Sequence, residues 1–414
     1  MSQLAIDGGP PVRAEPMPPR RLFGPQEKAA AVEVFDEAIA SGQAFGYAGQ
    51  HEQAYERAFA DWLGGFAKGV NSGTSAVLAA LAALELDCGS EVVVPPISDP
   101  GGVMPVVMLN CVPVPADGDG RSFNASPAGI DSAITPRTRA ILVAHIMGEP
   151  CDMPVICELA RRRGLPVVED CAQAHGAEVA GRAVGTWGEI AAFSTMSGKH
   201  HASGAQGGVV FTRDETLFWK ARRFMDRGKP YGLSGETTNV ALGLNLNSNE
   251  LSAAIGLVQL RKLPDILRRR RALADAVAEA TAGLRAVRLA RPMDGAVGSY
   301  WFLRFTVEPA LLRVDKDKFA AAVAAEGIPV IGSYRHIPSE AAWFRGRKTY
   351  GRTGCPWTCP HYAGPRDAAY PLPNIESALG VNFLVAMHEN WTPREVADTA
   401  EALRKVEAAY RTCQ

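Results

Sequence analysis

Short apolar segments alternate with helical segments along the chain from about residue 70 to residue 227. The apolar segments lack polar alternation, which indicates strands buried on both faces. The expected strands are Glu91–Val94, Val112–Val114, Ala140–His145, Pro166–Glu169, Ile190–Ser194 and Gly208–Thr212. The expected helices are Ser75–Leu86, Val103–Leu109, Met153–Arg163 and Asp214–Arg227. This alternation predicts an α/β fold, with a large domain whose mostly parallel central sheet lies between helices.

The sequence outside this region suggests how the domains are divided. Residues 1–24 are rich in proline and glycine and are expected to form an irregular N-terminal arm. The large domain then spans residues 25–264, and a long helical run over 249–284, kinked at Pro264, leads into a smaller α+β C-terminal domain over 265–414. The other expected elements are helices at 25–41, Glu52–Trp62 and Lys316–Glu326, strands at Trp301–Val307 and Pro329–Ile331, an irregular loop at 332–376, and a last helix with a capping box at Thr392.

Composition excludes several classes of protein. The chain has 414 residues, of which 47% are apolar and 21% charged, so wholesale disorder and a coiled coil are excluded. The net charge of -1 gives no general attraction to nucleic acid. The N-terminus lacks a signal-peptide pattern, and the longest apolar stretches are too short to span a bilayer. We therefore expect a cytoplasmic protein that binds neither membranes nor nucleic acid.

The eight cysteines are scattered along the chain and do not form a dense disulfide framework. Cys355 and Cys359, with His361 close by, have the residue types of a metal site. A zinc site needs a fourth ligand and usually a tighter pairing of cysteines. We therefore expect free thiols and no metal, with zinc as the alternative.

Three segments carry residues that are suited to chemistry. Val70–Ala76 runs directly into an apolar helix, whose first amides bind an anion or are simply capped by a hydroxyl. Asp170 lies at the end of an expected strand, where a carboxylate either pairs with a cationic ligand or caps a helix. Lys199 follows another strand and precedes a glycine-rich turn. A lysine there is either an exposed loop residue or a desolvated, nucleophilic amine.

Taken together, the three segments match the needs of pyridoxal phosphate. Amides and hydroxyls hold its phosphate, a lysine forms the Schiff base, and a carboxylate keeps the pyridine nitrogen protonated so that the ring acts as an electron sink.

The chain also resembles a known family, the DegT–StrS group of sugar and aminocyclitol aminotransferases, which have the aspartate-aminotransferase fold (type I). The resemblance covers nearly the whole chain, and it is the combination of segments that makes it specific. The matching segments are Leu4–Arg13, Tyr55–Ala60, Asn71–Ala76, Glu169–Ala177, Ser194–Gly208, Gly243–Leu251 and Ala253–Leu260.

The resemblance implies roles for residues around the cofactor ring. Lys199 would be the Schiff-base lysine and would shuttle the proton during transamination. Asp170 would pair with the pyridine nitrogen, and Gln173 would contact the ring hydroxyl.

The resemblance also implies a phosphate site shared between two subunits. Ser194, five residues before the lysine, would bind the phosphate through its hydroxyl, and Gly73 and Thr74 would supply amides. Asn245 would reach the phosphate from the partner subunit, so an obligate homodimer with shared active sites is expected.

Two positions depart from the family pattern. In the segment 95–102, Asp99 takes the place of an aromatic residue that often stacks on the cofactor ring, and we place it among the cofactor-binding residues. The turn after Lys199 is one residue longer than usual, with Gln206 where an acidic residue is common. Both changes bear on the substrate and leave cofactor attachment intact.

The resemblance implies an aminotransferase that moves an amino group from glutamate or glutamine to a keto sugar or keto cyclitol. The alternative is a sugar dehydratase of the same family, which carries histidine in place of the lysine, so Lys199 argues against it. A binding protein that kept the fold is disfavoured by the intact Lys199 and Asp170. Candidate acceptor contacts, for which core packing is the favoured alternative, are Tyr300, Trp301, His336 and the loop 357–362.

Overall fold

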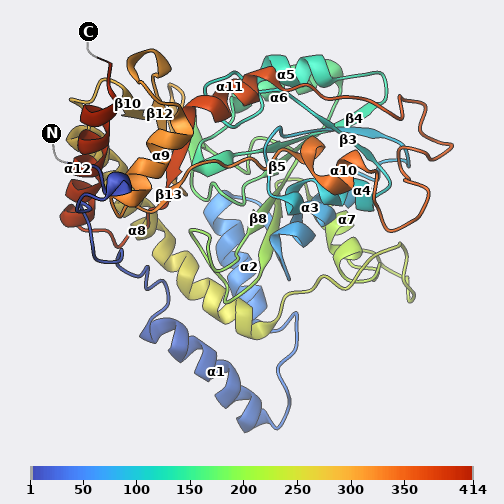
Figure 1. Cartoon of the computed structure of the whole chain (residues 1–414). Coiled ribbons are helices and arrows are strands. Elements are labelled where there is room, and N and C mark those ends of the chain that lie inside the picture. The colour runs from blue at the N-terminus through green and yellow to red at the C-terminus, as the bar shows by residue number, and fades with distance from the viewer. Residues whose placement is uncertain (1–2, 413–414) are drawn as a thin grey trace.

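The computed structural model describes residues 3–412 and is built around a seven-stranded sheet (Figure 1). Its strands are β1 (Phe66–Val70), β2 (Glu91–Val94), β3 (Val112–Pro115), β4 (Thr138–Ala144), β5 (Val167–Asp170), β8 (Ile190–Ser194) and β9 (Gly208–Thr212), in the order β1-β9-β8-β5-β4-β2-β3. The run β3-β2-β4-β5-β8 is parallel, whereas β9 is antiparallel to both β8 and β1. The prediction of a mostly parallel central sheet is therefore confirmed.

Helices cover both faces of this sheet, because alternate residues of each strand point to opposite sides. Val92, Leu142 and Val168 pack with α3, α4 and α7, while Val143 packs with α6 and Phe193 packs with α2 and α8. The helices before residue 230 are α1 (Pro25–Ser41), α2 (Gln50–Leu63), α3 (Gly73–Ala82), α4 (Met104–Met108), α5 (Pro127–Ala133), α6 (Met153–Arg163) and α7 (Glu215–Met225), and α8 (Glu250–Ala280) follows.

A second, antiparallel sheet lies near the two termini (Figure 1). It has the order β10-β12-β14-β13, with β10 (Val287–Leu289), β12 (Leu303–Val307), β13 (Val330–Ile331) and β14 (Asn382–Val385). Its strands share an apolar core with α8, α9 (Lys316–Ala325) and α12 (Pro393–Tyr410). The smaller elements are the sheet of β6 (Glu178–Val179), β7 (Arg182–Ala183) and β11 (Ala296–Val297), the helices α10 (Ala342–Arg345) and α11 (Pro373–Val381), and 3₁₀ turns at Ala5–Asp7, Pro100–Gly102, Ile146–Gly148, Pro309–Leu311 and Pro338–Glu340.

Helix α8 joins the two sheets. It continues as one helix through Pro264, so the expected domain boundary at residue 264 falls inside it. Because α8 packs against α1 and α2 at one end and α12 at the other, the division into two domains stays a prediction. In the part of the chain that the structure describes, no helix is both long enough and apolar enough to cross a bilayer.

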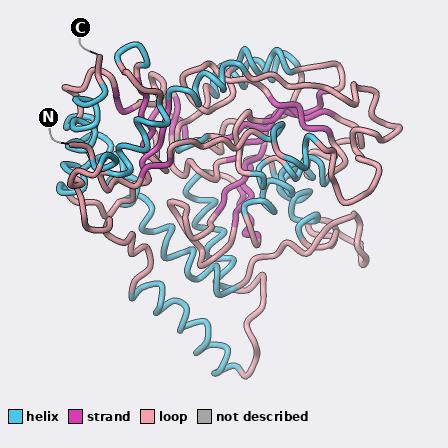
Figure 2. Tube along the Cα trace, in the orientation of Figure 1, coloured by secondary structure: helices cyan, strands magenta, loops and turns pink. Residues whose placement is uncertain are grey.

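Over its described residues, 3–24, the N-terminal arm is irregular apart from one 3₁₀ turn, but it is closely packed. Leu4 is buried in the core of the smaller sheet. Arg13 forms ion pairs with Glu395 (3.0 Å) and Asp398 (2.7 Å) of α12. The arm then runs from the region of the smaller sheet to the start of α1, as the pink trace of Figure 2 shows.

Candidate active site

A pocket of about 290 Å³ opens at the carboxyl ends of β5 and β8, next to the start of α3. Six of the predicted site residues line it: Gly73, Thr74, Asp99, Asp170, Ser194 and Lys199. They come together because β1, β8 and β5 all end at the same edge of the sheet. Strand pairing sets Val70 and Ser194 on either side of Gly208, and Asp170 beside Ala192. Gln206, from the longer turn, also faces this pocket.

The N-terminus of α3 is both capped and open toward the pocket. Ser72 caps the helix by accepting a hydrogen bond from the Ser75 amide (3.1 Å), which leaves the Gly73 and Thr74 amides on the pocket side. A side chain at Gly73 would not fit, because its Cβ would lie 2.6 Å from the Ser194 Cβ. The glycine thus lets β8 approach α3 closely. Free amides beside a serine hydroxyl are the donors that a phosphate needs.

Asp170 ends β5 and is buried at the side of the pocket. Burial raises the pKa of its carboxyl, and a hydrogen bond from the Ala172 amide (3.0 Å) opposes this rise. A Cβ at Gly102 would lie 2.9 Å from Asp170 Oδ2, so glycine is required for this close approach. A buried carboxylate of this kind is stabilised by a cationic nitrogen beside it.

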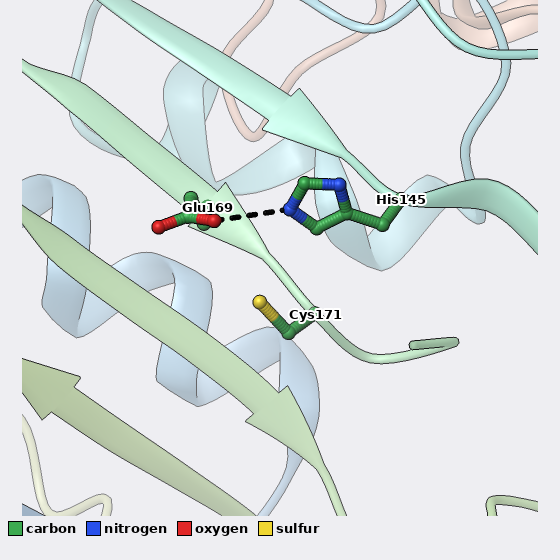
Figure 3. A group of neighbouring side chains, drawn as sticks. All are labelled: His145, Glu169 and Cys171. Carbon is green, nitrogen blue, oxygen red and sulfur yellow. Dashed lines mark hydrogen bonds and ion pairs between the residues drawn. The ribbon is translucent and has the colours of Figure 1, made fainter. Parts of the chain in front are cut away.

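Glu169, next to Asp170, points to the opposite face of β5 and meets His145 and Cys171 (Figure 3). The ligand atoms of the three residues lie within 4.8 Å of one another, which is close enough for a metal ion. Glu169 instead accepts hydrogen bonds from the backbone amides of Gly185 (2.8 Å) and Trp187 (2.7 Å), and His145 Nε2 donates to it (3.1 Å). His145 Nδ1 accepts from the Cys151 amide, so both ring nitrogens are occupied. We infer that the hydrogen bonds of this group stabilise the end of β5.

Lys199 is 7% exposed, and its Nζ lies 4.1 Å from the centre of the Trp301 ring. The ring is held in place because Trp301 Nε1 donates to the Gly198 carbonyl (3.0 Å). Burial lowers the pKa of Lys199, although the charges of Asp170 and Asp99 oppose this. Among residues 3–412, no ion pair of its ammonium group is found. The amine is therefore desolvated and free to react. This agrees with the interpretation of Lys199 as a nucleophilic amine and not as an exposed loop residue.

Two predicted site residues lie outside the pocket. The Gln173 side chain is buried, accepts a hydrogen bond from the Met147 amide (2.9 Å) and donates to Tyr334 (3.0 Å). Asn245 is exposed and accepts a hydrogen bond from Asn247 (2.8 Å). Their contacts with the cofactor stay predictions, and that of Asn245 requires a second subunit.

Of the candidate acceptor contacts, some lie beside the pocket residues and others lie in apolar clusters. Trp301 covers Lys199, whereas Trp357 is fully buried in a separate apolar cluster with Phe344 and Tyr362. Core packing therefore explains Trp357 and Tyr362 of the loop 357–362. Tyr300 belongs to the core of the smaller sheet. The His336 ring contacts that of Tyr334 at a tilted angle, with ring centres 4.5 Å apart.

The sequence analysis missed a cluster that holds the Lys199 turn from behind. Arg20 of the arm donates to the carbonyls of Lys199 (2.7 Å) and His200 (3.1 Å) and pairs with Glu389 (2.9 Å). Arg270 of α8 pairs with the same Glu389 (2.9 Å) and donates to the Tyr300 carbonyl (2.8 Å). An arginine in a proline-rich arm, here followed directly by Arg21, carries no sequence signal of such a role.

The fold and the pocket together define an aminotransferase of the type I fold. Similarity to known proteins then identifies its family. The chain belongs to the DegT/DnrJ/EryC1/StrS aminotransferase family, which it matches over residues 25–363. It is 32% identical to the L-glutamine:2-deoxy-scyllo-inosose aminotransferase of Micromonospora echinospora, over 99% of this chain and 98% of that protein.

Two further relatives agree with this assignment. The UDP-N-acetyl-3-dehydro-alpha-D-glucosamine 3-aminotransferase of Acidithiobacillus ferrooxidans is 38% identical over 64% of this chain and 70% of that protein. An aminotransferase from Psychrobacter cryohalolentis superposes with a TM-score of 0.82 at 28% identity, covering 95% of this chain and 99% of the other. The protein is therefore an aminotransferase, and the dehydratase alternative is not supported.

Proposed function

We propose that the protein binds pyridoxal phosphate in the pocket of Lys199 and transfers an amino group from glutamine or glutamate to a keto cyclitol or keto sugar. The observation that supports this best is the meeting of Lys199, Asp170 and the Gly73–Ser194 contact in one pocket. The family is one of pyridoxal-phosphate-dependent enzymes. These residues suit the cofactor, because its phosphate, its pyridine nitrogen and its aldehyde each have a matching partner among them.

Each residue has a role that follows from its surroundings. The amides of Gly73 and Thr74 and the Ser194 hydroxyl hold the phosphate. The Asp170 carboxylate pairs with the pyridine nitrogen and is relieved of the cost of its own burial. When bound, the cofactor supplies an electron sink next to the carbon that loses its proton. The Lys199 amine, with its pKa lowered by burial, attaches the cofactor and then moves that proton as a general base and acid.

The choice of substrate rests on the relatives. The relative from M. echinospora is named for L-glutamine and 2-deoxy-scyllo-inosose, and the one from A. ferrooxidans for a keto sugar nucleotide. We favour a free keto cyclitol, because the match to the former spans nearly the whole of both chains. Asp99 gives this pocket a carboxylate where an aromatic residue is common, and a hydroxyl-rich acceptor suits such a hydrogen-bond acceptor.

The proposal includes a homodimer in which each pocket is completed by the partner chain. Helix α1 extends away from the body of the molecule (Figure 1) and exposes Phe35 and Ile39, while the segment after α7 exposes Leu242 and Leu244 beside Asn245. Large apolar side chains gathered in this way are typical of a protein interface. A second copy of the chain is the partner that also brings Asn245 to the pocket.

Cofactor attachment is tested by reducing the purified enzyme with borohydride after adding pyridoxal phosphate. We expect the pyridoxyl group on the peptide that contains Lys199 and expect Lys199→Ala to lose the visible absorbance of the bound cofactor. Lys318→Ala, which changes an exposed lysine of α9, serves as the control. This variant should keep both the pyridoxyl label on the Lys199 peptide and the visible absorbance. Labelling of another peptide, or of none, would refute the assignment.

Substrate choice is tested separately with inososes, keto sugar nucleotides and both amino donors. We expect glutamine-dependent amination of an inosose, detected by mass spectrometry of the product. Amination of sugar nucleotides alone would refute the choice of acceptor while leaving the aminotransferase assignment intact.

A further inference from the structure

Three cysteine thiols that are far apart in sequence meet at the surface, away from the active-site pocket. Cys88 lies in the loop before β2, and Cys355 and Cys359 lie in the segment between α10 and α11. Cys88 Sγ is 3.7 Å from Cys359 Sγ, and the Cys355 thiol lies next to that of Cys359. The sequence analysis considered only Cys355 and Cys359, because nothing local connects them with Cys88.

The distance between the sulfurs distinguishes two uses of such a cluster. Disulfide sulfurs are about 2.05 Å apart. Two thiolates on one zinc ion, each about 2.3 Å from the metal in a tetrahedral arrangement, are roughly 3.8 Å apart. The two thiols are hydrogen-bonded at a separation of 3.7 Å, which excludes a disulfide and is also the spacing that a shared zinc ion requires. A disulfide between two of the three cysteines would also leave the third thiol outside the bond.

The backbone around Cys359 supports a thiolate. The His361 amide donates to Cys359 Sγ, and the Tyr362 amide donates to the Cys359 carbonyl (3.0 Å), so the chain turns tightly around the sulfur. This turn lies against the Cys88 loop, because a Cβ at Gly89 would be 2.8 Å from the His361 carbonyl oxygen. Amide donors to a metal-bound sulfur are the kind of outer contact that tunes a metal site.

The cysteine-bearing segment is also anchored on both sides of the cluster, so the ligands are held near one another before any metal binds. Trp357, between the two cysteines, is fully buried with Phe344 and Val112. Beyond Cys359, the Tyr362 hydroxyl donates to the buried Glu91 of β2 (3.0 Å). A site on a preformed scaffold loses less ordering entropy when the ion binds.

We propose that Cys88, Cys355 and Cys359 bind a zinc ion as thiolates, with His361 as the fourth ligand. The ion would replace three thiol protons, which are released to solvent. It would fasten the segment between α10 and α11 to the large domain. This departs from our expectation of free thiols and no metal.

The test measures zinc in the purified full-length protein after incubation with zinc chloride and removal of unbound metal. We expect about one zinc ion per chain and at least a tenfold loss of retained zinc in Cys88→Ser and in Cys359→Ser. Cys157→Ser is the matched control, because this half-buried thiol of α6 contacts only the Trp187 carbonyl among described hydrogen-bond partners, and it should keep its zinc. His361→Ala should weaken zinc binding less than loss of a thiolate.

Cobalt chloride offers a second measurement that does not depend on the variants folding. Binding to the wild-type protein should give a thiolate-to-cobalt absorption band and the intense visible bands of tetrahedral cobalt. The proposal is overturned if neither metal is retained while all three thiols react with a thiol reagent. It is equally overturned if a peptide map without reductant shows a disulfide between Cys88 and Cys359.

Discussion

At the scale of single residues, burial moves the two principal groups of the pocket in opposite senses. It raises the pKa of Asp170 and lowers that of Lys199, so each is pushed toward its uncharged form. A ligand with a cationic nitrogen at one end and an electrophilic carbon at the other satisfies both groups at once. The empty pocket is therefore destabilised by these two buried groups, and binding of the proposed cofactor would relieve this destabilisation.

Asp99 adds a charge to the pocket that favours the ammonium form of Lys199. The change Asp99→Asn removes this charge and should lower the pKa of Lys199 further. We expect competitive acetylation of the apoenzyme to reach half of its maximum at Lys199 at a lower pH than in the wild type. Asp317→Asn, in the exposed first turn of α9, is the control and should leave this pH unchanged. An unchanged or higher pH in Asp99→Asn would contradict the expected coupling.

Glu56 provides a pH dependence of stability that is independent of the active site. It shares Lys68 with Glu52. Burial, with the charge of Glu52, raises the pKa of Glu56 to about 7, although Lys68 opposes this rise. The native state thus holds a proton between pH 4.5 and about 7 that the unfolded state has lost, and stability falls as pH rises through this window.

The change Glu56→Gln should remove this dependence. We expect the free energy of unfolding of the variant, measured by urea titration, to fall less between pH 5 and pH 8 than that of the wild type. The difference should be a few kcal/mol at most. Glu33→Gln, an exposed position on α1, is the control. A wild-type slope of zero in this window would contradict the prediction.

At the scale of elements, the N-terminal arm acts as a support for the active site. Arg20 holds the backbone of Lys199 from outside the pocket, and Glu389 and Arg270 hold Arg20 in turn. The same Arg270 holds the backbone before Trp301, which covers the amine. The lysine and its aromatic cover are therefore positioned by one ion-pair network that reaches from the arm to α8.

The change Arg20→Ala should misplace the Lys199 backbone without removing a group that contacts substrate. We expect kcat to fall roughly ten- to a hundredfold, with a much smaller change in KM. Arg20→Lys should restore little, because three acceptors are arranged for the fork of a guanidinium. Arg394→Ala, which breaks the exposed pair with Glu15 of the same arm, should behave as the wild type. A kcat within twofold of wild type for Arg20→Ala would contradict a positioning role.

The elements also show which parts of the structure could be predicted from the sequence. β2, β8, β9 and α6 were predicted to the residue, because uninterrupted apolar runs and turn residues mark them locally. The capping box of Thr392 and Glu395 was predicted for the same reason. β1 was missed, since Lys68 and Gly69 interrupt it and the lysine is buried only through its pairing with α2.

The residues of the candidate site also divide into those that a local sequence pattern marks and those that it does not. Lys199 and Asp170 were found because each follows a recognisable strand, and all the residues expected on the pocket's own chain except Gln173 line it. Arg20 and Cys88 depend on contacts with residues far along the chain, which no local pattern records. Contacts of this kind form only when distant segments pack together, so they could not be predicted from local sequence patterns.

At the scale of the whole molecule, the described chain exposes large apolar side chains on α1 and in the segment after α7. Ile39 of α1 is 76% exposed, and Leu242, close to Asn245, is 89% exposed. Such side chains cost free energy in water unless another surface covers them. A dimer would bury both regions, and in the same step it would carry Asn245 to the phosphate end of the partner's pocket. Assembly and catalysis would then be linked.

This link can be tested by mixing two inactive variants. In a dimer of one Lys199→Ala chain and one Asn245→Ala chain, one pocket combines both defects, and the other has the native lysine together with the native asparagine. Because random exchange gives half mixed dimers with one native pocket each, we expect about a quarter of the wild-type activity to return. Mixing Lys199→Ala with Asp170→Ala should restore none, since both residues come from the same chain in every pocket. Failure of the first mixture to regain activity, once light scattering has shown exchange of subunits, would mean that Asn245 does not act across the interface.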